Sequence, residues 1–280
     1  MTSCFKLVAL RIFDGCDSSI KKCLQSGRFY YFCNDYVIKG GGKQIERASK
    51  YNEPLSDDFF LLNEQKKDLN ISLQAVVGMN GDGKSSLVEI VLRLINNFSI
   101  SRHIHSVDHK PLAANNVSAE LYYIKDGTFY CLSEQEGDIE GMKLWQYKSE
   151  GNQYIRYSIV PDEELQDGFF YSLVSNYSHY AYNTIEYKNE SSGKQDEDCW
   201  LYHVFHKNDG YQVPLSLHPY RYQGNIDINR ERELTKPRLV STIVRILMAD
   251  DNNTYEFNGK TFEGLKLSDV GYSKFQERTL

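Results

Sequence analysis

The sequence predicts an α/β fold in which a mixed sheet packs against one long helix and carries an antiparallel β region. Three observations support this prediction: the composition is that of a globular domain, aromatic residues gather in short β-prone runs, and one apolar segment has helical spacing. The chain has 280 residues, of which 41% are hydrophobic and 25% charged, with 21 Tyr and 14 Phe. These values exclude a disordered, collagen-like or coiled-coil protein.

Two β-prone runs open the chain. Residues 5–13 end at Asp14-Gly15, and residues 28–38 end at the glycine triplet Gly40–Gly42. Because β-branched and aromatic residues favour strands and glycine ends them, we predict that these two runs form an antiparallel pair. We interpret the triplet as a flexible turn and not as a phosphate contact, since no helix follows it directly.

A glycine-rich motif follows the polar stretch 43–68. Residues 71–77 are a continuous apolar run, which predicts a buried strand ending at Gly78. Residues 78–85 read Gly-Met-Asn-Gly-Asp-Gly-Lys-Ser and match G-x-x-x-x-G-K-[ST] at every fixed position. Apolar residues at helical spacing come next, so we predict a helix over 84–97 that packs against the sheet. Strand, loop and helix thus occur in the order that a phosphate-binding loop needs.

The residue types in this loop suit the binding of a nucleoside triphosphate. Glycines at 78, 81 and 83 permit positive φ and let backbone amides approach phosphate oxygens. Lys84 can contact the β and γ phosphates, the Ser85 hydroxyl can bind Mg²⁺, and the helix N-terminus adds partial positive charge. The predicted nucleotide-binding residues are Gly78, Asn80, Gly81, Asp82, Gly83, Lys84, Ser85 and Ser86, with Ser85 as the Mg²⁺ ligand.

The loop sequence Gly-x-Asn-Gly-x-Gly-Lys-Ser-Ser-Leu resembles that of ABC-type ATPase heads of the SMC and DNA-repair families. In those heads an antiparallel β subdomain follows the first helix. Here residues 117–124 and 128–132 flank Asp126-Gly127, which predicts a hairpin, and residues 144–148 and 154–160 extend it.

Phrases in the middle of the chain are similar to ATPases of bacterial anti-phage systems of the Septu and retron kind. These phrases lie at residues 176–183, 205–212 and 224–231. The resemblance implies a P-loop NTPase fold, an ABC/SMC-like head lobe, with ATP and Mg²⁺ as cofactors. It also implies nucleotide-dependent dimerisation with a second copy of the head, hydrolysis, and control of a partner nuclease or other effector subunit.

The implied domain organisation is a single ATPase head lobe over residues 1–280. Opening strands, loop and first helix occupy 1–100, the antiparallel β region 117–185, and a helical or mixed segment 199–280. Nucleic acid stays open as a partner, although a net charge of −6 does not favour phosphate neutralisation.

The sequence departs from the family pattern in its second half. A complete head carries an L-S-G-G-Q-like signature and an apolar strand that ends in Asp-Glu. Residues 267–271 share only part of the signature, and the apolar run before Asp250-Asp251 has helical spacing after Pro237, which predicts a helix over 237–249. We therefore expect the first lobe of a longer ATPase, which binds nucleotide without hydrolysing it alone.

Two other functions stay open. The first is a nucleotide-sensing interaction scaffold that holds partners together without turnover. The second is a P-loop kinase, which the long antiparallel region at 117–160 argues against, because kinases of this loop type usually continue with parallel βα units.

The remaining histidines and cysteines predict no metal site. Cys199, His203 and His206 have zinc-like spacing, but no fourth ligand is evident and apolar neighbours favour a core helix. We interpret His103, His105 and His109 as a polar loop. No segment has the roughly 18–20 apolar residues of a membrane span, and no secretion signal opens the chain. The sequence thus predicts a cytoplasmic protein with reduced thiols and no membrane partner.

Overall fold

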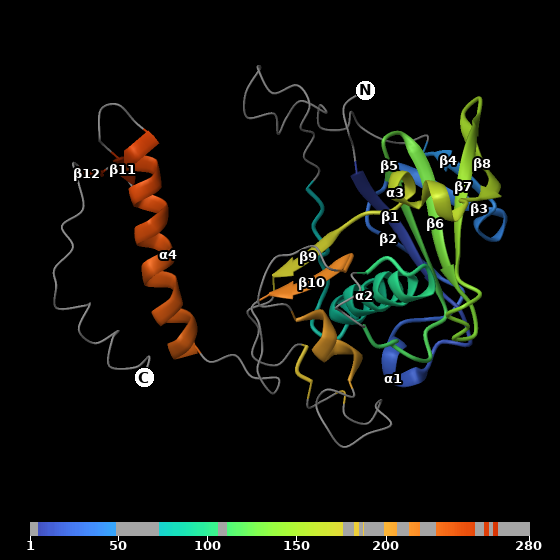
Figure 1. Ribbon diagram of the computed structural model, residues 1–280. Helices are drawn as coiled ribbons and strands as arrows, with labels where there is room; N and C mark the ends of the chain where they lie inside the picture. Colours follow the sequence, from blue (N-terminus) through green and yellow to red (C-terminus); the bar gives the residue numbers. More distant parts are fainter. Residues whose placement is uncertain are drawn as a thin grey trace. The chain divides into compact units, whose positions relative to one another are not determined.

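The chain forms two compact units, Met1–Asn225 and Ile226–Leu280 (Figure 1). The computed structural model describes residues 5–48, 73–105, 111–175, 182–184, 187, 199–205, 213–218, 228–249, 255–257 and 260–262.

The first unit is built on an eight-stranded sheet with strand order β2-β1-β5-β6-β7-β8-β4-β3. Every neighbouring pair in it is antiparallel. The strands are β1 (Phe5–Ile12), β2 (Phe29–Tyr31), β3 (Tyr36–Lys39), β4 (Gln44–Arg47), β5 (Ala119–Lys125), β6 (Thr128–Glu134), β7 (Lys143–Glu150) and β8 (Gln153–Ile159).

The remaining elements of this unit are short, apart from one long helix. Strands β9 and β10 form a separate parallel pair. The helices and these strands are α1 (Ser18–Lys21), η1 (Gly40–Gly42), α2 (Lys84–Ser101), η2 (Asp162–Glu164), α3 (Leu165–Gly168), β9 (Ser172–Ser175), η5 (Trp200–Val204) and β10 (Leu215–His218).

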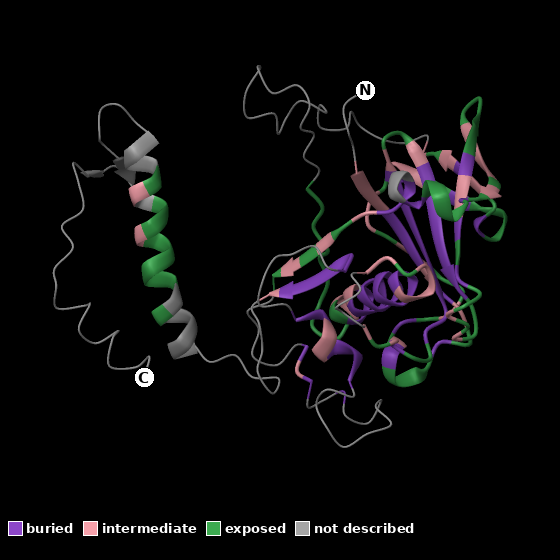
Figure 2. Ribbon diagram, viewed as in Figure 1, coloured by how far each residue is buried: buried purple, intermediate pink, exposed green. Residues whose placement is uncertain are grey.

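Helix α2 packs on one face of the eight-stranded sheet and is buried over most of its length (Figure 2). Alternate side chains of β5 belong to two different hydrophobic clusters, one on each face of the sheet. Leu121 and Tyr123 belong to the cluster that includes α2, whereas Tyr122 and Ile124 belong to a second cluster. Successive side chains of a strand point to opposite faces, so the sheet is buried on both sides here.

The sheet curls around this second cluster. The backbone N–H of Ile38 in β3 donates to the Tyr31 hydroxyl of β2 at 3.1 Å, although these strands are the first and last of the sheet. The rings of Tyr36 in β3 and Phe129 in β6 lie 4.8 Å apart, which places residues of non-adjacent strands in contact across the interior. The curvature therefore encloses a core of its own.

This architecture corrects the predicted fold class. We expected a P-loop NTPase fold with a mixed sheet, but the main sheet is antiparallel and curled, and few helices accompany it. The prediction failed because it treated residues 71–77 as a buried strand. An apolar run alone does not distinguish a strand from other segments, since a strand also needs neighbouring backbones with free hydrogen-bonding groups.

Several local predictions are confirmed. The hairpin at Asp126-Gly127 joins β5 to β6, with positive φ at both turn residues (51° and 78°), and the next two runs form β7 and β8. The first run forms β1 and pairs with β2, but the second run is divided between β2 and β3. A further strand, β4, comes from the polar stretch that we did not assign.

The second unit contains α4 (Ile228–Ala249) and the hairpin of β11 (Tyr255–Phe257) and β12 (Lys260–Phe262). The helix predicted over 237–249 is confirmed and begins earlier, with Pro237 inside it. Asp250, Asp251 and the segment 267–271 lie outside the described residues. None of the helices that the structure describes combines the length and apolar character that crossing a bilayer requires.

Candidate functional site

The glycine-rich loop lies at the N-terminus of α2 and is exposed from Gly78 to Asp82. Gly81 has φ 93° and Gly83 has φ 85°, which confirms two of the three predicted left-handed glycines. Gly78 does not have positive φ. It is instead closely approached, because a Cβ at this position would lie 2.9 Å from Asp82 Oδ2.

The loop is wrapped around the ammonium group of Lys84. Lys84 Nζ donates to the carbonyl oxygens of Gly78 and Met79, at 2.7 Å each. The lysine is the first residue of α2, so the cation lies between the helix terminus and the loop that precedes it. Its current acceptors are backbone carbonyls at the protein surface, which a stronger anionic acceptor can replace.

A carboxylate of the loop itself occupies one of the loop amides. Asp82 Oδ2 accepts a hydrogen bond from the Met79 N–H at 2.6 Å, and the Asp82 N–H donates to the Met79 carbonyl at 3.3 Å. A negatively charged oxygen thus already lies where the loop can bind an anion. This carboxylate is a feature that any bound phosphate chain must accommodate.

The first turn of α2 offers further amides. Gly83 caps the helix without a side-chain hydrogen bond, and the first bond of the helix runs from the Leu87 N–H to the Gly83 carbonyl at 2.9 Å. The amides before Leu87 therefore have no acceptor within the helix. Ser85 is exposed beside them, whereas the Ser86 side chain is buried, so Ser86 can contribute only its backbone amide to a ligand in solvent.

The segment before the loop does not form the predicted buried strand. Residues 73–77 have no regular secondary structure and are exposed, with Val77 at 90%, while residues 71 and 72 lie outside the described residues. One side chain anchors the segment: Gln74 accepts from the Leu7 N–H at 3.1 Å and donates to the Leu7 carbonyl at 2.7 Å. This contact falls at the register shift between Leu7 and Ala9, where the β1–β5 ladder is interrupted.

Sequence reasoning missed two residues that support the loop from a distant part of the chain. The Cys23 thiol donates to the Gly81 carbonyl at 3.0 Å, across a separation of 58 residues. Leu24 lies against Gly83, since a Cβ there would be 2.6 Å from Leu24 Cδ2. Neither residue belongs to a motif, so no pattern in the sequence indicates this contact.

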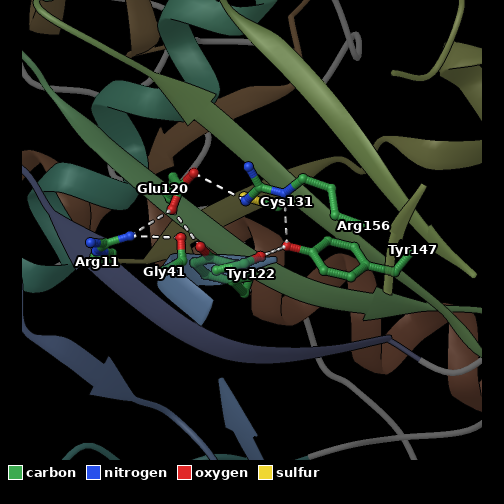
Figure 3. A network of polar contacts seen from close by, with 8 residues as sticks. Arg11, Gly41, Glu120, Tyr122, Cys131, Tyr147 and Arg156 are labelled. Atoms are coloured by element: carbon green, nitrogen blue, oxygen red, sulfur yellow. Dashed lines mark hydrogen bonds and ion pairs between the residues drawn. The ribbon is translucent and has the colours of Figure 1, made fainter. Parts of the chain in front are cut away.

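The glycine triplet lies beside a second polar cluster (Figure 3). Arg156 Nη2 donates to Glu120 Oε1 at 3.1 Å, and Arg11 Nη1 lies 3.8 Å from Glu120 Oε2. Arg11 also donates to the Gly41 carbonyl at 2.8 Å, and the Tyr147 hydroxyl donates to the Gly42 carbonyl. The triplet is therefore an ordered turn held by two side-chain hydrogen bonds, with Gly42 buried and Gly40 and Gly41 exposed, and not a flexible one.

Burial explains the chemistry of this cluster. It raises the pKa of the Tyr122 and Tyr147 hydroxyls and of the Cys131 thiol, so all three stay protonated and neutral at pH 7. A Cβ at Gly42 would collide with the Tyr122 hydroxyl. These contacts join the turn after β3 to β1, β5 and β7, which is a structural role.

A buried carboxyl lies on the other face of the sheet, against α2. Glu134 is fully buried and accepts hydrogen bonds from Asn97 Nδ2 at 3.1 and 3.0 Å. Burial raises the pKa of Glu134 from 4.5 to about 8. The Asn97 amide also donates to the Ala114 carbonyl at 2.8 Å, so this contact joins the sheet, the helix and the loop before β5.

Two of the other candidate ligands lie outside the described residues. Cys199 is buried and precedes η5, which is a 3-10 turn within the core in place of the expected core helix, while His206 lies outside the described residues. His103 and His105 follow α2, and His109 lies outside the described residues. The part of the chain that the structure describes contains no group of three or more His, Cys, Asp or Glu side chains arranged to hold a metal.

Comparison of the sequence with models of protein families found no matching family, and comparisons with curated proteins and with solved structures found no matching protein. The geometry of the loop and its motif are the basis of the function proposed below.

Proposed function

We propose that residues 78–86 bind the phosphate chain of a nucleoside triphosphate, with ATP as the nucleotide. The observation that carries the proposal is the exposed loop folded around Lys84 Nζ, which contacts the Gly78 and Met79 carbonyls at 2.7 Å each. The left-handed glycines and the uncapped amides of α2 support it, because they offer N–H donors to an anion at the positive end of a helix.

The same geometry fits Mg²⁺ bound together with the nucleotide. Ser85 is exposed in the first turn of α2 and offers one hydroxyl oxygen. Mg²⁺ in nucleotide sites takes only one or two protein ligands and completes its shell with phosphate oxygens and water. We propose that Ser85 holds the ion and that the ion in turn neutralises phosphate charge.

Equilibrium binding of fluorescent ATP with Mg²⁺, to wild type and to Lys84→Ala, tests this proposal. We expect the substitution to weaken binding at least 100-fold while the melting temperature stays unchanged. Lys143→Ala removes another exposed lysine, far from the loop in sequence, and should bind like wild type. Equal affinity of wild type and Lys84→Ala would refute the proposal.

We also propose, on the resemblance of the loop and of residues 176–183, 205–212 and 224–231 alone, that ATP binding drives pairing of two copies and control of a nuclease subunit in anti-phage defence. Light scattering with and without a non-hydrolysable ATP analogue tests the first step. A doubling of mass with the analogue, absent in Lys84→Ala, is the expected result. An unchanged mass would contradict both this role and that of an interaction scaffold.

A further inference from the structure

We propose that Cys23 and Leu24, which follow α1, are positioning residues of the nucleotide loop and set its affinity for the phosphate chain. We call these two residues the loop support. The inference rests on the proposed function, because it concerns the same loop. It adds a part of the site that lies far from the motif in sequence and that the motif does not predict.

The first contact orients a peptide group of the loop. Cys23 Sγ donates to the Gly81 carbonyl at 3.0 Å. The carbonyl and the N–H of one trans peptide point in opposite directions, so holding the Gly81 carbonyl at Cys23 directs the Asp82 N–H the other way. That amide indeed points into the loop, where it donates to the Met79 carbonyl at 3.3 Å. The thiol thereby orients the Asp82 N–H, one of the amides of the proposed phosphate site.

The second contact sets the position of the helix cap. A Cβ at Gly83 would lie 2.6 Å from Leu24 Cδ2 and 2.9 Å from Cys23 Sγ, so the backbone of Gly83 rests directly on the support. Leu24 is only 4% exposed and belongs to the core cluster that includes α2. Because interiors are close-packed, the Leu24 side chain has little room to move and keeps Gly83, the N-cap of α2, in position.

Contacts outside the loop also hold the support. Asp17 caps α1 by accepting from the Ser19 N–H at 2.7 Å, and the Leu24 N–H donates to the Lys21 carbonyl at 2.8 Å. Helix α1 also packs against α2. Local hydrogen bonds and core contacts therefore hold Cys23 and Leu24 in addition to their contacts with the loop.

Binding of fluorescent ATP with Mg²⁺ to Cys23→Ala, Cys23→Ser and Leu24→Ala tests the inference. We expect Cys23→Ala to weaken binding about three- to tenfold, the range of a single net hydrogen bond. Cys23→Ser keeps a donor and should lie between alanine and wild type. Leu24→Ala should weaken binding about tenfold or more, because it removes the base under Gly83.

Two controls separate positioning from general destabilisation. Cys33→Ala removes a half-buried thiol elsewhere and should bind ATP like wild type. Ile20→Ala removes a buried side chain of α1 that is 2% exposed and should lower the melting temperature like Leu24→Ala with a smaller loss of affinity.

The outcomes distinguish this inference from the proposed function. If wild type binds ATP and Lys84→Ala does not, but the three support variants bind like wild type, only the loop support is refuted. Equal losses of affinity in Ile20→Ala and Leu24→Ala would also refute it, since both would then act through stability. Failure of wild type to bind ATP would refute the proposed function and the inference with it.

Discussion

The protein contains two glycine-rich turns that hold positive charge, and they differ in burial. At the triplet Gly40–Gly42, the exposed Gly41 carbonyl accepts from Arg11 and the buried Gly42 carbonyl accepts from Tyr147. At Gly78–Gly83, backbone carbonyls accept from Lys84 at the surface. The donor chemistry is similar, but Arg11 at the first turn also lies beside the buried carboxylate of Glu120, whereas the acceptors described for Lys84 are exposed carbonyls.

The difference shows what distinguishes a binding turn from a structural one. In a binding turn a ligand can replace the groups that contact the cation, and the glycine content of the turn does not decide this. Glu120 neutralises the guanidinium groups at the triplet and is 2% exposed, so loss of its contacts would leave buried charge without a partner. Around Lys84 the acceptors are exposed, and water or phosphate can take their place at little cost. A triphosphate can therefore compete at the second turn and not at the first.

The largest expected effect is the change with pH in the unfolding free energy that the buried Glu134 causes. The pKa of Glu134 is raised from 4.5 to about 8, so the native state holds this proton more tightly than the unfolded state does. The contribution of Glu134 to stability is therefore greatest below pH 4.5 and is lost as the pH rises to about 8. We expect a loss of about 3–5 kcal/mol over that range from this group.

Denaturant unfolding of wild type and Glu134→Gln across pH 4–9 checks this prediction. The glutamine variant cannot ionise and should gain stability relative to wild type as the pH rises. Glu136→Gln, at an exposed position two residues away, should follow the wild-type curve. Parallel curves for wild type and Glu134→Gln would contradict a raised pKa.

Alanine at one glycine of each turn tests the comparison directly. Gly42→Ala introduces a Cβ that collides with the Tyr122 hydroxyl at φ 95°, and we expect it to cost about 2–4 kcal/mol of unfolding free energy. Gly81→Ala places a Cβ in open space at φ 93° and should cost about 1 kcal/mol.

The affinity for ATP should be affected more by Gly81→Ala than by Gly42→Ala, the opposite of the order for stability. Gly81→Ala should weaken it strongly, because a Cβ obstructs the approach of phosphate to the loop amides. Gly42→Ala should leave the affinity unchanged at temperatures where it is folded. A variant pair with equal stability losses and equal affinities would remove the distinction between the two turns.

The next effect concerns the carboxylate within the loop. Asp82→Asn keeps an acceptor for the Met79 N–H but removes a negative charge beside the proposed triphosphate. We expect ATP to bind about fivefold more tightly, since two unit charges about 4 Å apart in water interact by about 1 kcal/mol. The gain should shrink at high salt because ions screen exposed charges. Weaker binding by Asp82→Asn at low salt would show that the carboxylate assists the ligand.

The smallest effect is expected before the loop. Val77 is 90% exposed, so Val77→Ser should change the unfolding free energy by less than about 0.5 kcal/mol. Thermal unfolding measures this change. Val91 in α2 is 7% exposed, so Val91→Ser is the buried counterpart and should lower the melting temperature by several degrees. A large loss in Val77→Ser would show that this residue is buried after all.

The sequence by itself determined the local elements. The Asp126-Gly127 hairpin, the runs that became β7 and β8, helix α2 and the helix over 237–249 all follow from turn chemistry or periodicity, which act over a few residues. The composition of the loop likewise predicted left-handed glycines at 81 and 83 and a lysine at the helix start.

Only the tertiary structure decided what these elements contact. The antiparallel order of the main sheet, the exposure of residues 73–77, the burial of Gly42 and the support of Gly81 by Cys23 all depend on segments distant in the chain. Periodicity records how apolar a face is, but a strand, a turn or a loop becomes buried only when a partner supplies matching hydrogen bonds and surface. The sequence carries no local signal of that partner.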